Sequence, residues 1–291
     1  MEVSMNHQSC EQLTQMNLSA MRGEYQRQEE LPATLELGFD ERFSMIVQAQ
    51  FDKRRNNRIS RALKEAALRE PSATLSEIEF SDKRNLSKHQ MAQLSGMSWV
   101  RDGKGIIVTG ATGTGKTFIL CAFAHDACIM GFTARYYRMT RLIEYMAAAR
   151  DTGEYDKKLS ELGKPDILIL DDFGMKQCDH LFSLDLLEIM EERYHKRKSV
   201  LIGAQMPVRL WPEFFKNRTA ADGFMDRIVN NAYRIDLKGP SRRPRIPDDE
   251  MWKSCIADAP ETPEASVPER VASSEKPETQ EQDSQADGKV K

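Results

Sequence analysis

One run of eight residues, from Gly110 to Thr117, has the residue types and spacing of a phosphate-binding loop. Glycines let a loop fold so that successive backbone N–H groups and a following helix N-terminus face an anion. The pattern G-x-x-x-x-G-K-[ST] adds a lysine for the β- and γ-phosphates and a hydroxyl for Mg²⁺. We predict that ATP binds at Gly110, Ala111, Thr112, Gly113, Thr114, Gly115, Lys116 and Thr117, with Thr117 on Mg²⁺. The alternative is a glycine-rich turn without a ligand.

A pair of carboxylates, Asp171 and Asp172, follows the apolar run 167–170. Ligands of open parallel sheets bind at the carboxyl ends of the strands, so a buried strand would deliver both side chains there. We predict that Asp171 holds the magnesium ion, directly or through water, and that Asp172 polarises the attacking water. The alternative is an Asp pair that only caps the next turn.

Three further polar positions could complete such a site. Gln205 follows the apolar run 199–202 and could orient the lytic water or contact the γ-phosphate. Arg227 lies in a helical pattern and could stabilise transition-state charge in a neighbouring subunit, as arginine fingers do. Arg193 is a weaker candidate for that role, and the basic pair in 239–243 could sense the nucleotide in cis. The alternatives are a surface glutamine and ordinary salt-bridged helix faces.

These residues are positioned by short apolar runs that alternate with helical patterns between 101 and 238. Such alternation is typical of a parallel sheet with crossover helices, that is, an α/β fold of the P-loop type with five strands. The predicted strands are 105–109, 132–137, 166–170, 199–202 and 233–237. The predicted helices are 118–130, 139–150, 181–197 and 219–231.

Residues 1–100 carry helical periodicity without a convincing strand, which predicts a helical N-terminal module. Its clearest helix has Asp40 as the expected N-cap and Phe43, Val47 and Phe51 on one face. Six of the twelve positions from Lys53 to Lys64 are basic, and three of them share a helical stripe: Arg54, Arg58 and Arg61. A cationic stripe suits a nucleic-acid backbone without sequence readout, although a solvated helix face is the usual explanation. A second basic set could line a DNA path: Arg135, Arg138, Arg141, Arg150, Lys157 and Lys158.

The composition of the 291-residue chain limits the class of protein. Its formal charge of −3 excludes a histone-like polycation, and no apolar run approaches the roughly 18 residues of a membrane span. The polar, acidic start does not resemble a signal peptide. Five cysteines without a C-x-x-C pair indicate neither a disulfide framework nor a zinc site, and suit a reducing cytoplasm. Cys121 and Cys128 are expected to pack in the core.

The charge is unevenly distributed along the chain. Residues 248–291 carry twelve acids and five bases, a net of −7, which leaves +4 for residues 1–247. Few large apolar residues follow Trp252, so we expect disorder from about Asp258 onward and assign this tail no function. The predicted division is a helical domain at 1–100, an ATPase domain at 101–247 and a disordered acidic tail at 248–291.

Several motifs together resemble one family. After the helical N-terminal module, the chain carries the motifs GATGTGKT, LILDDFGM, LLEIMEERY, AQMPVRLW and ADGFMDRIVNNAYRIDLKG. In this combination the chain resembles the IstB-like transposition helper ATPases, relatives of DnaC-type helicase loaders in the AAA+ superfamily. The similarity covers roughly residues 15–245. The resemblance implies Gly110–Thr117 as Walker A and Asp171–Asp172 as Walker B, and it implies three further roles: Gln205 as sensor 1, Arg227 as the trans finger and Arg243 as a sensor 2-like residue.

The sequence departs from the wider AAA+ pattern at two positions and from the pattern of the narrower family at a third. Asp172 stands where glutamate is usual and Gln205 where asparagine or threonine is usual, which implies slow, switch-like hydrolysis. Pro240 interrupts the Gly-Glu-Ser that the family commonly carries.

The resemblance implies an ATP-dependent helper of insertion-sequence transposition. Such a protein would form homo-oligomers with ATP between subunits, assemble on double-stranded DNA, and recruit or stimulate a separate transposase, without a membrane. The nearest alternative is a replicative helicase loader. A more distant one is a P-loop kinase for a small molecule, which would need a substrate lid and have no use for an arginine in trans.

Overall fold

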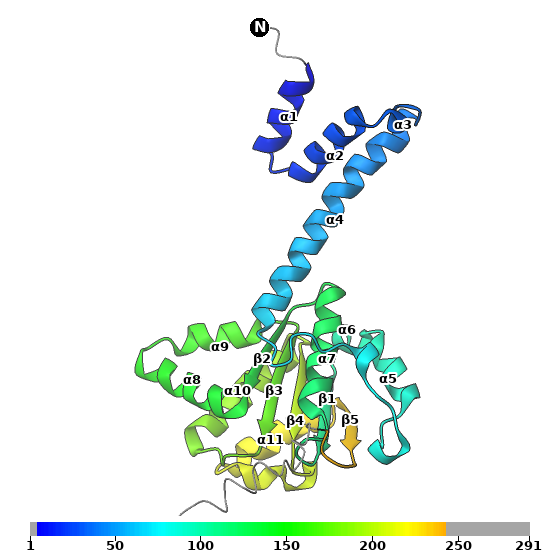
Figure 1. Cartoon of the computed structure of the whole chain (residues 1–291). Helices are drawn as coiled ribbons and strands as arrows, with labels where there is room; N and C mark the ends of the chain where they lie inside the picture. Colours follow the sequence, from blue (N-terminus) through cyan, green and yellow to red (C-terminus); the bar gives the residue numbers. More distant parts are fainter. Residues whose placement is uncertain (1–4, 243–291) are drawn as a thin grey trace, which may run out of the picture. The chain divides into compact units, whose positions relative to one another are not determined.

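The computed structural model describes residues 5–242 (Figure 1). The predicted tail and Arg243 lie outside the described residues. The helices before the sheet are α1 (Met5–Gln15), α2 (Ser19–Glu30), α3 (Pro32–Leu35), α4 (Phe39–Ala66), η1 (Leu75–Glu77), η2 (Asp82–Arg84), α5 (Lys88–Ser95) and α6 (Ser98–Arg101). The elements that follow are β1 (Gly105–Gly110), α7 (Lys116–Ile129), β2 (Ala134–Arg138), α8 (Met139–Asp151), α9 (Tyr155–Gly163), β3 (Ile167–Phe173), α10 (His180–His195), β4 (Ser199–Ala204), η3 (Val208–Phe214), α11 (Arg218–Val229) and β5 (Ala232–Leu237).

The five strands form one parallel sheet in the order β2-β3-β4-β1-β5. Each predicted strand is present within a few residues, which confirms the predicted fold class. Strand β3 runs to Phe173, three residues beyond its predicted end, so that it includes both aspartates. Its pairing with β4 shifts register between Leu170 and Phe173, where those aspartates lie.

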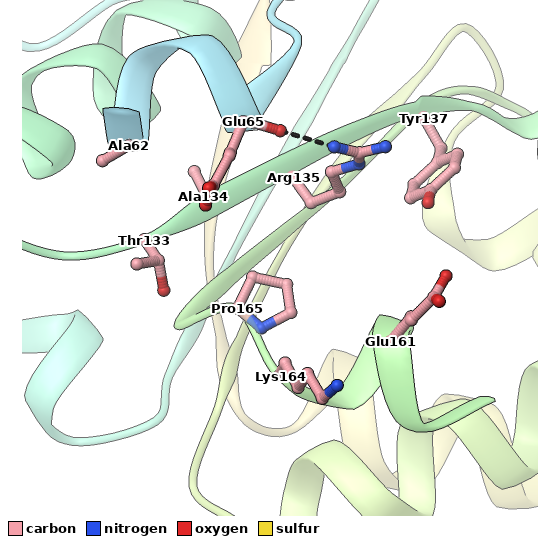
Figure 2. Close-up of a pocket in the computed structure, with 9 residues that line it drawn as sticks. All are labelled: Ala62, Glu65, Thr133, Ala134, Arg135, Tyr137, Glu161, Lys164 and Pro165. Atoms are coloured by element: carbon pink, nitrogen blue, oxygen red, sulfur yellow. Dashed lines mark hydrogen bonds between the residues drawn. The ribbon is translucent and has the colours of Figure 1, made fainter. Parts of the chain in front are cut away.

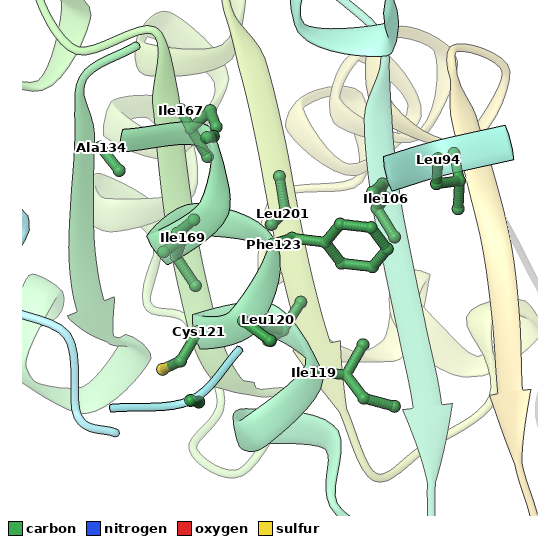
Figure 3. Packing of buried hydrophobic residues seen from close by; sticks show 14 of the residues in the cluster. Leu94, Ile106, Ile119, Leu120, Cys121, Phe123, Ala134, Ile167, Ile169 and Leu201 are labelled. Carbon is green, nitrogen blue, oxygen red and sulfur yellow. The ribbon is translucent and has the colours of Figure 1, made fainter. Parts of the chain in front are cut away.

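Both faces of the sheet are buried, because alternate residues of each central strand enter different hydrophobic clusters. The hydrophobic cluster around helix α7 includes Ile106, Ile169 and Leu201 (Figure 3). Ile107 and Leu170 belong to the cluster formed with α8, α10 and α11. Two-sided burial explains why these strands read as continuous apolar runs. The sheet is therefore a rigid platform for the loops at its carboxyl edge.

The core also holds the two cysteines of α7. Cys121 and Cys128 are fully buried, as predicted, and burial raises the pKa of each thiol to about 11. Nothing among residues 5–242 forms a helix with the length and apolar character that a bilayer crossing requires.

Helix α4 is the long basic helix predicted in the N-terminal module. The prediction of Asp40 as its N-cap was wrong, because the helix begins at Phe39 with Gly38 as the cap. The Glu41 carboxylate accepts a hydrogen bond from the Gly38 backbone N–H at 3.3 Å, and acidic side chains in a first turn favour the helix dipole. The helix ends at Ala66, after which Ala67 adopts the left-handed conformation at φ 50°.

The apolar face of α4 is exposed rather than packed. Phe43, Val47 and Phe51 are 51, 43 and 61% exposed. Helix α2 packs on another face, where the side chain of Gln50 accepts hydrogen bonds from the backbone N–H groups of Ala20 and Met21. Periodicity thus predicted the helix correctly but not the face that becomes buried.

Candidate nucleotide-binding site

The glycine-rich loop joins β1 to α7 at the carboxyl edge of the sheet. Gly113 and Gly115 have φ angles of 83° and 96°, a left-handed region that disfavours residues with a Cβ. The Thr114 hydroxyl donates to the Ala111 carbonyl at 2.8 Å and braces the turn. No side chain caps the start of α7, which leaves the helix N-terminus directed at the site of the phosphates.

Lys116 and Thr117 open helix α7 and direct their polar atoms into this site. The Lys116 ammonium donates to the carbonyls of Gly110 and Ala111, each at 2.8 Å, and lies folded over the loop. The Thr117 hydroxyl donates to Asp171 Oδ2 at 2.6 Å. The sheet therefore brings the two sequence motifs into direct contact.

Asp171 is fully buried and closely fitted at the end of β3. Its Oδ2 also accepts from the Tyr136 hydroxyl at 2.9 Å, and its Oδ1 accepts from the Asp172 backbone N–H at 2.9 Å. Burial, followed by the neighbouring charge of Asp171, raises the pKa of the Tyr136 phenol. A Cβ on Gly203 would lie 2.5 Å from Asp171 Oδ1, so only glycine leaves room for this carboxylate.

The donor set at this point suits magnesium. Thr117 and Asp171 offer hard oxygen donors, and Mg²⁺ is commonly held by one or two carboxylates together with substrate phosphates. Within residues 5–242 there is no group of three or more His, Cys, Asp or Glu side chains that could hold a metal by themselves. The geometry therefore fits a cation shared with a nucleotide.

Asp172 adopts a left-handed backbone, with φ 58°, and its carboxylate is bound by two arginines. Asp172 Oδ2 accepts from Arg138 Nε at 3.0 Å and from Arg138 Nη2 at 2.9 Å, while Arg69 Nη1 lies 3.7 Å away. A carboxylate held in this way is neutralised, so it must leave Arg138 before it can act on a water. Sequence reasoning missed these two partners. The only signal was the place of Arg138 at the end of the predicted second strand, next to the carboxyl edge.

Gln205 follows β4, the strand that lies between β1 and β3. Its side-chain oxygen accepts from the Thr112 hydroxyl at 2.8 Å. Its amide therefore lies at the tip of the phosphate loop, close to where a γ-phosphate would be bound.

The chain after β5 closes the far side of the loop. The Arg242 backbone N–H donates to the Gly113 carbonyl at 2.9 Å, and the Arg242 side chain pairs with Glu79. Buried Arg84 donates to the Thr114 carbonyl at 3.1 Å, and burial, followed by the charge of Arg242, lowers the pKa of Arg84. Arg84 was also missed, because an isolated arginine in a loop gives no sequence signal.

The two finger candidates have different surroundings. Arg193 is 1% exposed and donates to the backbone carbonyls of Leu162, Pro165, Asp166 and Ser199. Arg193 therefore cannot reach a neighbouring subunit, and that prediction was wrong. Arg227 Nη2 contacts Glu191 Oε1 at 2.6 Å, and Arg227 lines a hollow with Gly105, at the opposite edge of the sheet from the phosphate loop. Arg227 does not contact the nucleotide motifs of its own chain.

Comparison with known proteins matches residues 11–248 to the model of one family, described as IstB-like ATP binding protein. The chain belongs to this IstB-like family. It is 32% identical over 237 residues to an insertion sequence ATP-binding protein of Sinorhizobium fredii, covering 81% of this chain and 96% of the relative. It is 34% identical over 203 residues to the ATP-binding protein of insertion sequence IS1162 of Pseudomonas fluorescens, covering 70% and 87%.

The fold of this IstB-like chain is also found among solved structures. The crystal structure of DnaI superposes with a TM-score of 0.50 at 22% identity, covering 59% of this chain and 91% of that one. This likeness concerns the fold alone. Together with the family match, the loop geometry shows an ATP-binding protein, an ATPase of the insertion-sequence type.

Proposed function

We propose that this IstB-like protein is the ATP-dependent DNA-binding helper of an insertion-sequence transposition system. It assembles with ATP on double-stranded DNA and recruits or stimulates a separate transposase, within the reducing cytoplasm that its cysteine usage predicts. The observation that carries the DNA-binding proposal is the set of exposed cations on α4. These cations have no acidic partner in residues 5–242.

The basic run of α4 is available to an external anion. All six basic side chains between Lys53 and Lys64 are exposed, and no Asp or Glu interrupts the run. Lys53 donates to the Ser19 hydroxyl at 2.6 Å, and none of the six is ion-paired with another residue of the described chain. A helix turns 100° per residue, so Arg54, Arg58 and Arg61 fall within about 60° of one another. Such a row suits successive phosphates of a duplex backbone.

The second basic set differs from the cations of α4, because each of its six side chains has a partner within residues 5–242. Arg135 donates to the Glu65 carbonyl, and the other five pair with carboxylates. The pairs are Arg138–Asp172, Arg141–Glu144, Arg150–Asp185, Lys157–Glu154 and Lys158–Glu161. A cation that already has an attractive partner within the chain gains less binding free energy from contact with a DNA phosphate. We therefore assign DNA contact to α4 and not to this set.

The nucleotide site would act as the switch for assembly. Lys116 and the loop N–H groups bind the phosphates, and Thr117 and Asp171 hold the Mg²⁺ that neutralises charge on the phosphoryl oxygens. Asp172 orients the attacking water once it leaves Arg138, and Gln205 contacts the γ-phosphate. Arg243, which lies outside the described residues, is the proposed sensor of the nucleotide in cis.

Arg227 would act in trans, which places ATP between subunits of a homo-oligomer. The helical part at 1–100 would supply the DNA contacts and the part at 101–247 the ATPase, with 248–291 as an appended tail.

The test is duplex binding by purified protein with and without ATP, compared with Lys116→Ala. We expect the wild-type protein to assemble and bind a labelled duplex in the presence of ATP, and Lys116→Ala to lose both responses. Lys157→Ala is the matched control, because Lys157 is exposed and paired only with Glu154. Unchanged assembly and binding in Lys116→Ala would contradict the proposal, as would equal binding to a single strand and a duplex.

A further inference from the structure

Arg69 connects the end of the basic helix to both aspartates of the ATPase site. It lies three residues after α4, beyond the left-handed turn at Ala67. Its Nη1 lies 3.7 Å from Asp172 Oδ2. The Tyr136 hydroxyl interacts with the Arg69 guanidinium and raises the pKa of Arg69, and the same hydroxyl donates to Asp171 at 2.9 Å. One guanidinium therefore contacts the expected catalytic carboxylate directly and the expected metal ligand through one hydroxyl.

The end of α4 is fixed to the strand that carries Tyr136. Ala62 and Ala66 are buried in the α7 core. Arg135 of β2 donates to the Glu65 carbonyl at 2.7 Å, beside a pocket of about 400 Å³ (Figure 2). This guanidinium satisfies one of the last carbonyls of the helix, which have no partner within the helix itself. The end of α4, strand β2 and the residues that follow the helix therefore meet at one junction.

The basic stripe lies close to this junction. Arg61 precedes the end of the helix by five residues, which is about 7.5 Å along its axis. Phosphates bound along the stripe would pull on the last turns of a continuous helix. Arg69 follows this helix end closely in sequence and lies beside Asp172 in space.

We propose that Arg69 is a positioning residue that couples DNA on α4 to the ATPase site. With α4 free, Arg69 adds a second positive charge beside Asp172 and holds Tyr136 against Asp171. Duplex on α4 withdraws the guanidinium, which frees Asp172 from one of its two arginines and relaxes the Tyr136 contact. The inference rests on the proposed DNA binding by α4.

The experiment compares the wild-type protein with Arg69→Gln in two measurements. The first is turnover with and without saturating duplex. We expect Arg69→Gln to have, without DNA, a kcat equal to that of the DNA-bound wild type, and to respond to duplex by less than 1.5-fold. The second is duplex affinity with and without ATP, since coupling between two ligands is reciprocal. The ATP-dependent change in affinity should shrink by at least threefold in Arg69→Gln.

The controls separate coupling from damage. Arg141→Gln removes an arginine that is 77% exposed and pairs only with Glu144, and it should behave as wild type. Arg69→Lys keeps the charge but not the forked donor geometry, so we expect it to restore part of the coupling. Nucleotide affinity and ATP-dependent assembly should stay within twofold in Arg69→Gln, and a loss of either would overturn the inference.

The outcomes distinguish this inference from the proposed function. If the wild-type protein binds no duplex, the proposed function fails. If wild type and Arg69→Gln both bind duplex and show the same ratio of rates and the same ATP effect on affinity, the coupling role of Arg69 is wrong and the DNA-binding function stands.

Discussion

Whether a cation is already paired with a carboxylate of the chain predicts how strongly salt should affect the DNA binding to which that cation contributes. We compare two triple variants that remove the same formal charge. The first replaces the unpaired stripe on α4, Arg54, Arg58 and Arg61, by glutamine. The second replaces three cations that already have carboxylate partners: exposed Arg141, exposed Lys157 and half-buried Lys158. Glutamine has nearly the same helix propensity as arginine and lysine, so both variants should keep their helices.

The expected magnitude follows from counterion release. Three phosphate contacts give a slope of about −2.7 in log affinity against log salt for each bound protomer. Raising salt from 50 to 200 mM should then weaken the stripe contribution by about 40-fold. The α4 variant should lose that part of the slope, whereas the paired variant should keep it within about one unit.

Fluorescence anisotropy of a labelled duplex, titrated with protein and ATP at four salt concentrations, measures both slopes. The two variants must first show the same ATP affinity and the same assembly in sedimentation. Equal slopes for the two variants would refute the reasoning, because total charge and not the pairing state would then decide DNA contact. If the α4 variant keeps the wild-type slope, the assignment of DNA contact to the stripe is wrong.

Two further predictions concern stability. Arg193→Met removes a buried donor from four backbone carbonyls and should lower the free energy of unfolding by about 3 kcal/mol. Calorimetry should then show a loss of roughly 6–12 °C in Tm, whereas Arg141→Met should change Tm little. Burial by itself would raise the pKa of Asp166, but the Lys198 ammonium and the two donors of Thr133 outweigh it and lower that pKa. A carboxylate whose pKa is lower in the folded than in the unfolded state stabilises the fold at pH values above its unfolded-state pKa. This contribution to stability is lost as the pH falls through the folded-state pKa. Asp166→Asn should therefore be less stable than wild type at pH 7 in urea titrations, and the difference should begin to shrink at about pH 4 and vanish only below the lowered folded-state pKa of Asp166. A difference independent of pH would show that the Asp166 charge has no part in it.

Much of the site could be predicted because its signals are local. The phosphate loop depends on glycines at three positive-φ positions and on a lysine and a threonine at the start of a helix, all within eight residues. Parallel strands end at one edge of a sheet, so a loop after β1 and carboxylates at the end of β3 are brought close together. The 2.6 Å contact between Thr117 and Asp171 is the result.

The partners of charged residues could not be predicted in the same way. Arg138 and Asp172 are 34 positions apart, and their pairing depends on two strands lying side by side with one register. Arg193 carries a sequence pattern like that of an exposed helical arginine, yet it is buried, and backbone carbonyls from the end of α9, the segment before β3 and the start of β4 converge on it. The apolar face of α4 has the periodicity of a packed helix, but α2 packs elsewhere.

The sequence by itself determined the class of fold, the phosphate loop, the two aspartates and a helix with a basic stripe. These features follow from periodicity and from motifs whose residues act within a few positions of one another. Only the tertiary structure decided which cations remain unpaired, that Asp172 is held by Arg138 and Arg69, and that Arg193 supports the core. The physical reason is that a charge is neutralised by whatever lies within a few ångströms in space, and long-range packing sets that neighbour.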